Sequence, residues 1–282
     1  MATFTNQATM TYSGRTVLSN VVTGEITEPL VITKTALTPT YSADGVVTFA
    51  VTLTNTGQSA VTGVTLTDDL GAYTFGTETL TPLDHTVGAI LMITNGAVQP
   101  APTVASESPL TVTGITVPAG GNTVLIYETT PNGFAPLDTG DTITNTVTAA
   151  SADLAESVTA SETVTVGTSA ELNVVKSLSP TSVSNDQQLS YTFTVENTGN
   201  ADAPADTVLS DTFDPALTGI AVTFNGTAWT QGVEYTYVPA TGAFTTNAGS
   251  ITVPAATFTQ DAVTGEIITS PGEATLTVTG TL

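Results

Sequence analysis

The stretch TFTNQATMTYSG, residues 3–14, resembles an internal stretch of the same chain, TITNTVTAASAD, residues 142–153. Each contains Thr-Asn, then a threonine three residues after that asparagine, with apolar residues at alternate positions around it. Such alternation is typical of a β-strand with one buried face. The second copy lies where a domain would end. The first copy therefore predicts that the chain opens with a strand of the kind that closes a domain.

Two matching series of motifs follow these strands. The only two lysines of the chain lie in LVITKTA (Lys34) and LNVVKSL (Lys176), and each of these strands precedes one that ends in Asn-Thr-Gly. VTLTDDLG and DTVLSDTFD come next, then ITVP in both series, so the order repeats at roughly 142 residues. After the second series the chain ends with ATLTVTGTL, and nothing there corresponds to TITNTVTA. The repeat predicts two domain bodies, the second without its closing strand.

The short apolar runs, bounded by Gly, Pro, Asn and Asp, indicate an all-β fold with almost no helix. Their number and spacing favour two tandem immunoglobulin-like β-sandwiches. We expect the second sandwich to be completed by a donated N-terminal strand. The predicted division is residues 1–29 for the donor strand or strands and a linker, 30–166 for the first domain, 167–171 for a linker, and 172–282 for the second domain.

The composition excludes several classes of partner. The 282 residues include 25 acidic and three basic ones, which gives a net charge of −22. Nucleic acids and anionic membrane surfaces need a basic footprint, so neither is expected, and no segment is long and apolar enough to insert in a membrane. There is no cysteine and no D-x-D-x-D spacing, so we expect no disulfide, no metal and no cofactor. The start lacks the features of a signal peptide, which leaves either a removed signal or another export route.

Three polar residue types lie on the apolar phase of their strands, where alternate side chains face the core. Lys34 shares a face with Ile32, and Asp68 shares one with Leu66. Asn145 lies on the same face as its apolar neighbours at 143, 147 and 149. The same phase rule places Asp69 toward solvent. In the second body Lys176 and Asp211 occupy the matching positions, but no asparagine does.

This residue set can form an amide between two side chains. Burial lowers the pKa of a lysine and raises that of a carboxyl group. A neutral lysine amine is a nucleophile, and a protonated aspartic acid can donate a hydrogen bond to the amide oxygen that the amine attacks. The expected product is a Lys–Asn isopeptide bond, with loss of ammonia. Asp68 and Asp211 would each act once, so the chain is not expected to be an enzyme toward other molecules.

The ordered motifs resemble the bacterial conserved-repeat domain, also called domain of unknown function eleven. That resemblance covers both bodies. It implies immunoglobulin-like modules of a bacterial surface protein, located outside the cell on a cell or spore surface. In related surface domains a lysine of the first strand and an asparagine of the last one form an isopeptide bond, assisted by a buried acid. The resemblance thus implies an intramolecular Lys34–Asn145 bond.

In the second body the missing amide can be supplied by Asn6 of the opening strand. Phe4, Ala8 and Met10 share its face and would pack as the donor strand. Donation to a neighbouring molecule is a head-to-tail contact that does not close, which yields filaments. The sequence therefore predicts a structural subunit of a self-assembling fibre, locked by an intermolecular Lys176–Asn6 bond, with the chain itself as its partner.

Other interpretations stay open at this point. Lys34 and Asp68 could form a buried salt bridge beside a structural asparagine, and Asn6 could be an ordinary polar residue of a frayed strand. The N-terminal strand could also pack in cis, in a monomeric stalk or adhesin module that displays a site for an unknown surface ligand. A hydrolase is disfavoured, because His85 is the only histidine and no G-x-S-x-G motif is present.

Overall fold

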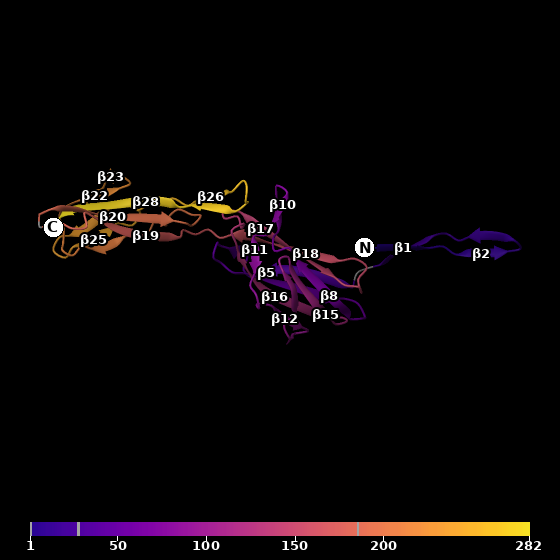
Figure 1. The fold of residues 1–282 in the computed structure, drawn as a ribbon. Helices are drawn as coiled ribbons and strands as arrows, with labels where there is room; N and C mark the ends of the chain where they lie inside the picture. Colours follow the sequence, from indigo (N-terminus) through magenta and orange to yellow (C-terminus); the bar gives the residue numbers. More distant parts are fainter. Residues whose placement is uncertain (1, 27–28, 185) are drawn as a thin grey trace. The chain divides into compact units, whose positions relative to one another are not determined.

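A computed structural model describes residues 2–26, 29–184 and 186–282. All regular elements in these ranges are β-strands, which confirms the predicted all-β fold (Figure 1). No helix in the described ranges is long and apolar enough to cross a membrane. The chain divides into two compact units. The first takes in residues up to Pro136 and from Asp141 to Val166, and the second takes in Leu137–Gly140 and Gly167–Leu282.

Residues 2–26 form a β-hairpin with two ladders. Strand β1 (Ala2–Asn6) pairs with β4 (Val22–Ile26), and β2 (Thr9–Tyr12) pairs with β3 (Arg15–Leu18). Ser13 and Gly14 form its turn with φ values of 44° and 70°, the left-handed backbone conformation that glycine adopts without strain.

The apolar alternation over residues 1–12 predicts one continuous strand, and the hairpin corrects this prediction. The strand is interrupted at Gln7 and Ala8, because Ser19 bonds there in place of a regular ladder. The Ala8 amide donates to the Ser19 hydroxyl at 2.9 Å, and the Ser19 amide donates to the Ala8 carbonyl at 2.9 Å. The sequence also predicts a second, weaker strand over residues 16–26, which is interrupted at the same level, between β3 and β4. Residues 27 and 28 of the predicted linker lie outside the described ranges.

The body of the first unit contains two six-stranded sheets. The first sheet has the order β13 (Ala97–Val98), β12 (Leu91–Thr94), β16 (Asn122–Pro131), β7 (Val47–Asn55) and β5 (Leu30–Ala36), and β11 (Leu83–His85) also pairs with β16. The second has the order β14 (Thr103–Glu107), β15 (Leu110–Val117), β8 (Val61–Asp68), β17 (Thr142–Ala150), β18 (Val158–Val166) and β6 (Thr40–Tyr41). A small hairpin, β9 (Tyr73–Phe75) with β10 (Glu78–Leu80), is separate from both.

Alternating side chains build the core between these two sheets. In β7, every second residue from Val47 to Leu53 is fully buried. Val51 of the first sheet and Leu66 and Val147 of the second line one enclosed space, so the two inner faces meet. Strands with this period 2 present one face to the core and the other to solvent.

The second unit repeats five of the six strands of the first sheet in the same order. Its five-stranded sheet has the order β19 (Leu172–Ser179), β20 (Gln188–Asn197), β28 (Gly272–Thr281), β22 (Thr218–Phe224) and β23 (Thr227–Ala228). This matches β5, β7, β16, β12 and β13. The facing sheet has only β21 (Ser210–Thr212), β25 (Ala243–Thr246) and β24 (Tyr235–Val238), and a hairpin of β26 (Thr257–Gln260) and β27 (Ile267–Ser270) lies apart.

The Asn-Thr-Gly motifs show that the two units match at the level of single hydrogen bonds. Asn55 accepts from the Gly57 amide and donates to the carbonyls of Ser59 and Val117. Asn197 accepts from the Gly199 amide and donates to two carbonyls in the same way, at Ala201 and Pro254. Asn55 thus holds the turn after its strand against β15 of the facing sheet, and Asn197 holds its turn against the segment at Pro254, which belongs to no strand.

Candidate cross-linking sites

Three side chains meet in the core of the first unit. The Lys34 amine, on β5, contacts the Asp68 carboxylate of β8 and donates to the Tyr127 hydroxyl of β16 at 2.9 Å. The Tyr127 hydroxyl in turn donates to the same Asp68 oxygen. Because β5 and β16 belong to one sheet and β8 to the other, this cluster connects the two layers of the sandwich.

Burial decides the electrostatics of the cluster. The Lys34 side chain is 0% exposed and that of Asp68 is 3% exposed. Desolvation lowers the pKa of the Lys34 amine, although the Asp68 charge and hydrogen bond oppose that shift. The pKa of Tyr127 is raised well above its usual value, first by burial and then by the Asp68 charge. Burial therefore favours the neutral amine, which is the nucleophilic form.

Asn145 lies beside this cluster on β17. Val147 pairs with Asp68 across the β17–β8 ladder, so Asn145 is diagonal to Asp68 on the same inner face. It is 0% exposed, and neither its amide nitrogen nor its amide oxygen has a hydrogen-bond partner in the described chain. It is still close enough to the Tyr127 hydroxyl to lower the pKa of that group slightly against the larger opposing effects.

A buried amide whose nitrogen and oxygen both lack a hydrogen-bond partner destabilises the folded protein. More than nine in ten buried polar groups are hydrogen-bonded, and leaving one unpaired costs about 1–3 kcal/mol. The arrangement can be relieved by attack of the Lys34 amine on the Asn145 side-chain carbonyl carbon. The new N–C bond forms, the bond to the Asn145 amide nitrogen breaks, and that nitrogen leaves as ammonia with a proton from the amine.

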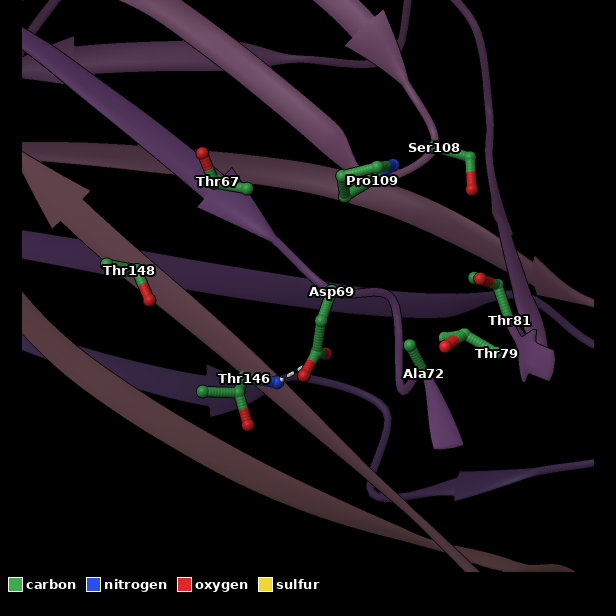
Figure 2. Close-up of a pocket in the computed structure, with 9 residues that line it drawn as sticks. All are labelled: Thr67, Asp69, Ala72, Thr79, Thr81, Ser108, Pro109, Thr146 and Thr148. Carbon is green, nitrogen blue, oxygen red and sulfur yellow. Dashed lines mark hydrogen bonds between the residues drawn. The ribbon is translucent and has the colours of Figure 1, made fainter. Parts of the chain in front are cut away.

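Asp69, adjacent to Asp68, faces the opposite side of the sheet, as the phase rule predicts, but it is not simply solvated. Its carboxylate accepts from the Thr146 amide at 2.8 Å and from the Gly71 amide at 2.9 Å. Figure 2 shows Asp69 among the residues that line a pocket, the others being threonine, serine, alanine and proline. The bond from Thr146 joins the end of β8 to β17, the strand that carries Asn145. Both bonds are accepted by the same carboxylate oxygen, Oδ1.

The second unit has a similar but open site. The Lys176 amine, on β19, contacts the Asp211 carboxylate of β21. Three aromatic rings surround the amine, with centroids at 4.6 Å for Tyr191, 5.4 Å for Phe193 and 5.5 Å for Phe213. The Lys176 side chain is nevertheless 40% exposed and that of Asp211 is 19% exposed. The prediction that Lys176 lies on a buried face is therefore wrong for this chain by itself.

The cause of this exposure is the absence of a cover over β19. Leu30 and Ile32 of β5 are 2% and 8% exposed, with β18 lying against them, whereas Leu172 and Val174 of β19 are 40% and 54% exposed. The positions of β17, β18 and β6 are vacant in the second unit, because β21 pairs only with β25 in the described part of the chain. Among the described residues of the second unit, no strand takes the place that β17 and β18 have in the first.

The N-terminal residues of the predicted donor set are exposed on their own hairpin. Asn6 lies opposite Val22, and Phe4 lies opposite Gly24 with its ring over that glycine. Phe4 is 54% and Met10 is 62% exposed, and Ala8 is exposed as well. These apolar side chains are free to contact another surface.

Tyr127 is the cluster residue that sequence reasoning missed. It lies on the buried face of β16 with Leu125, where the sequence pattern predicts only a side chain that packs in the core. A comparison of registers could have raised the question. Tyr127 lies opposite Phe49, and the equivalent position opposite Tyr191 in the second unit is Val278. At this strand position the first unit therefore has a hydroxyl, that of Tyr127, and the second unit has the apolar Val278.

Tyr127→Phe should slow formation of the Lys34–Asn145 bond, because the hydroxyl connects the amine and the acid that must exchange a proton. Proton transfer by a positioned group is worth about 10²–10⁴ in rate. Intact mass measured over time after purification should show monomer that has not yet lost ammonia, in contrast to the unchanged chain. Tyr41→Phe is the matched control, since its hydroxyl bonds only to the Pro136 carbonyl at 2.6 Å. Equal ammonia loss in both variants would contradict a role for Tyr127.

His85 gives no support to a hydrolase. Its Nδ1 lies 2.5 Å from the Glu107 carboxylate, and its Nε2 has no hydrogen-bond partner in the described residues. A nucleophilic hydroxyl on the imidazole, which a Ser-His-Asp triad requires, is therefore not found within the described ranges. No group of three or more potential metal ligands occurs in them either.

Comparison with known proteins gives similarity of fold only. No family model and no curated protein matches the sequence, so the resemblance to the conserved-repeat domain rests on the quoted motifs. Three solved structures illustrate the similarity. The major pilin subunit of Bacillus cereus is 11% identical, with 96% of this chain and 73% of the pilin covered and a TM-score of 0.37. The collagen-binding domain of a Staphylococcus aureus adhesin is 12% identical, with 50% and 99% covered and a TM-score of 0.31.

The third is a protein that catalyses macrocyclization in alchivemycin A biosynthesis, also 12% identical with a TM-score of 0.31, with 57% of this chain and 97% of that protein covered. Pilins, an adhesin and a biosynthetic catalyst thus resemble the chain to a similar degree. Similarity at this level does not distinguish among functions, so the function must follow from the residues of the chain itself.

Proposed function

We propose that the chain is the structural subunit of a self-assembling extracellular fibre. Each subunit inserts its N-terminal segment into the second unit of the next subunit, and a Lys176–Asn6 isopeptide bond locks the junction. A Lys34–Asn145 bond cross-links the first unit internally. The observation that carries the proposal is the vacancy in the second unit, at the position where the first unit holds the strand whose sequence matches the N-terminus.

Burial of apolar surface supplies the driving force for this insertion. Leu172 and Val174 on the acceptor, and Phe4 and Met10 on the donor, are each 40% or more exposed. Full burial of such a side chain is worth about 1.5–3 kcal/mol relative to full exposure, and about half of that when it is already half covered. Backbone hydrogen bonds between the donor and the unpaired side of β21 would add to this, as in other strand-addition contacts.

Docking also completes the chemistry. Lys176 and Asp211 already touch, so of the lysine, aspartate and asparagine found in the first unit only the amide, which Asn6 would bring, is missing. The counterpart of Tyr127 is Val278, so the junction would react without that hydroxyl. A covering strand would exclude water from the amine, as β17 and β18 do for Lys34. The reaction would then proceed once per junction, with loss of one ammonia. The site acts on its own polymer and needs no other substrate or cofactor.

The proposed contact leads to open filaments. The donor surface and the acceptor surface are different parts of the chain, so the interface is heterologous and can repeat without closing. The inserted segment would also cover the unpaired side of β21, which otherwise invites unspecific pairing. The resemblance to the conserved-repeat domain supports a bacterial cell or spore surface as the location, and a ligand displayed by the fibre stays unidentified.

Removal of residues 2–12 tests this function. The shortened chain should give no polymers, because it lacks the donor strand, and its second unit should unfold at a lower temperature than it does within a polymer. Gel electrophoresis after boiling in detergent, together with scanning calorimetry, measures both. Asn6→Ala is the companion variant: it should still form polymers in native conditions, but they should fall apart on boiling. An intact, boiling-resistant ladder from the shortened chain would refute strand donation.

A further inference from the structure

The strands of the first unit that have no counterpart beside β21 and over β19 are β17 and β18, which form a hairpin. In the first unit, β8 pairs with β17, β17 pairs with β18, and β18 lies against the inner side of β5. Val164 and Val166 of β18 are 0% and 5% exposed and help to cover that side. A single donated strand beside β21 would replace β17 alone. It would leave Leu172 and Val174 of β19 without the cover that β18 gives to their counterparts.

The N-terminal segment is itself a hairpin with apolar side chains on its second strand. Val17, Leu18, Val21 and Val22 are between 45% and 59% exposed. Val17 lies opposite Met10, and Val22 lies opposite Asn6, so both share a face with the predicted donor residues. A single-strand donor would leave these apolar side chains in solvent in every subunit of the fibre.

We infer that the donated element is the whole hairpin, residues 2–26, of a second copy of this chain. This inference rests on the proposed function and specifies its interface. Strand β1–β2 pairs with β21 as β17 pairs with β8, and β3–β4 lies over β19 as β18 lies over β5. The second strand thereby closes the Lys176 site. Val22 stands beside Asn6 at the position that Glu162 occupies beside Asn145, so the junction is less charged than the internal site.

The register of the junction follows from the first unit. There Val147 pairs with Asp68, and Thr148 pairs with Thr67. The motif match equates Thr148 with Thr9, and Thr67 with Ser210. Thr9 of one subunit should therefore lie opposite Ser210 of the next. Both are exposed in the free chain, so neither contributes to its core.

Because the chain has no cysteine, introduced pairs report this register without interference. Thr9→Cys in one preparation and Ser210→Cys in another, both in a Lys176→Arg background, should give a disulfide-linked dimer on mild oxidation. Opposite residues of antiparallel strands have Cα atoms about 4.5–5.5 Å apart, within the range that a disulfide spans. Thr5→Cys with Ser210→Cys, displaced by four residues, should give little dimer. Equal yields from both pairs would overturn the register.

Replacement of residues 15–26 by a Gly/Ser sequence of equal length separates the hairpin from a single strand. The first strand and Asn6 stay in place, so single-strand donation predicts an unchanged boiling-resistant ladder. Hairpin donation predicts that the ladder is lost or reduced by at least tenfold. The first unit should still lose its ammonia, which shows that the body folds. An unchanged ladder would overturn the hairpin and leave strand donation standing, whereas a wild-type chain without any ladder would overturn the proposed function itself.

Two single substitutions on the second strand extend this test. Val17→Asp alters the face shared with Met10, and Thr16→Asp alters the opposite face of the same strand. Both positions are exposed in the free hairpin, so neither change disturbs a core. If the second strand docks, Val17→Asp should reduce the rate of ladder formation several-fold more than Thr16→Asp. Equal rates would contradict docking of that face.

Discussion

A mixture of Lys176→Arg chains with Asn6→Ala chains should give a covalent dimer, although neither variant alone gives any covalent polymer. The Lys176→Arg chain keeps its donor amide but has a guanidinium, which stays protonated and cannot attack. The Asn6→Ala chain keeps the acceptor lysine but has no amide to donate. A single junction can therefore form between them, and it cannot be extended covalently. Boiling in detergent followed by gel electrophoresis and intact mass measures the product.

The masses distinguish donation in trans from packing in cis. In trans, each subunit lacks one ammonia from its Lys34–Asn145 bond, and the dimer lacks one more from the junction. In cis, each wild-type monomer would lack two ammonias, no ladder would form, and the mixture would give no dimer. That result would favour the monomeric stalk. A single band at full, unmodified mass would instead exclude both isopeptide bonds and leave only non-covalent strand exchange.

Strand positions and inner phases could be predicted where local sequence decides them. LVITKTA is β5 with the predicted ends, and its period 2 places Lys34 in the core. The same reasoning places Asp68 inside, because alternation along one strand fixes the direction of each side chain. Strand position and side-chain direction depend on a few neighbouring residues, so a single sequence is enough to predict them.

Properties that depend on a distant segment could not be predicted in this way. The phase rule gives Lys176 an inward direction, but exposure depends on whether another strand covers β19. The break at Ala8 comes from the Ser19 hydroxyl, which lies on the other strand of the hairpin. Tyr127 reads as a core aromatic until its hydroxyl is found between Lys34 and Asp68. In each case the contact is made by a residue that is distant in sequence, so the pattern of neighbouring residues does not predict it.

Asn145→Ala should lower the free energy of unfolding of the first unit by about 4–5 kcal/mol. The Lys34–Asn145 bond closes a loop on the order of 100 residues, and a cross-link of that span stabilises by about that amount through the entropy of the unfolded chain. The melting temperature should fall by roughly 10–20 °C. Calorimetry of the chain without residues 2–12, which is monomeric under the proposed function, measures the change. Thr144→Ala on the exposed side of β17 is the control and should stay within about 0.5 kcal/mol.

The size of this effect decides between the cross-link and the buried salt bridge. If no bond forms, Asn145 is a buried amide with no partner for either polar atom, and replacing it by alanine removes an unfavourable group. The variant would then be about as stable as the parent, or less stable only by the small cavity that the shorter side chain leaves. Lys34 and Asp68 remain paired in the variant, so no isolated buried charge confuses the result. A loss of several kcal/mol in the variant, together with a parent chain whose mass is one ammonia short, is the result expected if Asn145 joins the two sheets covalently.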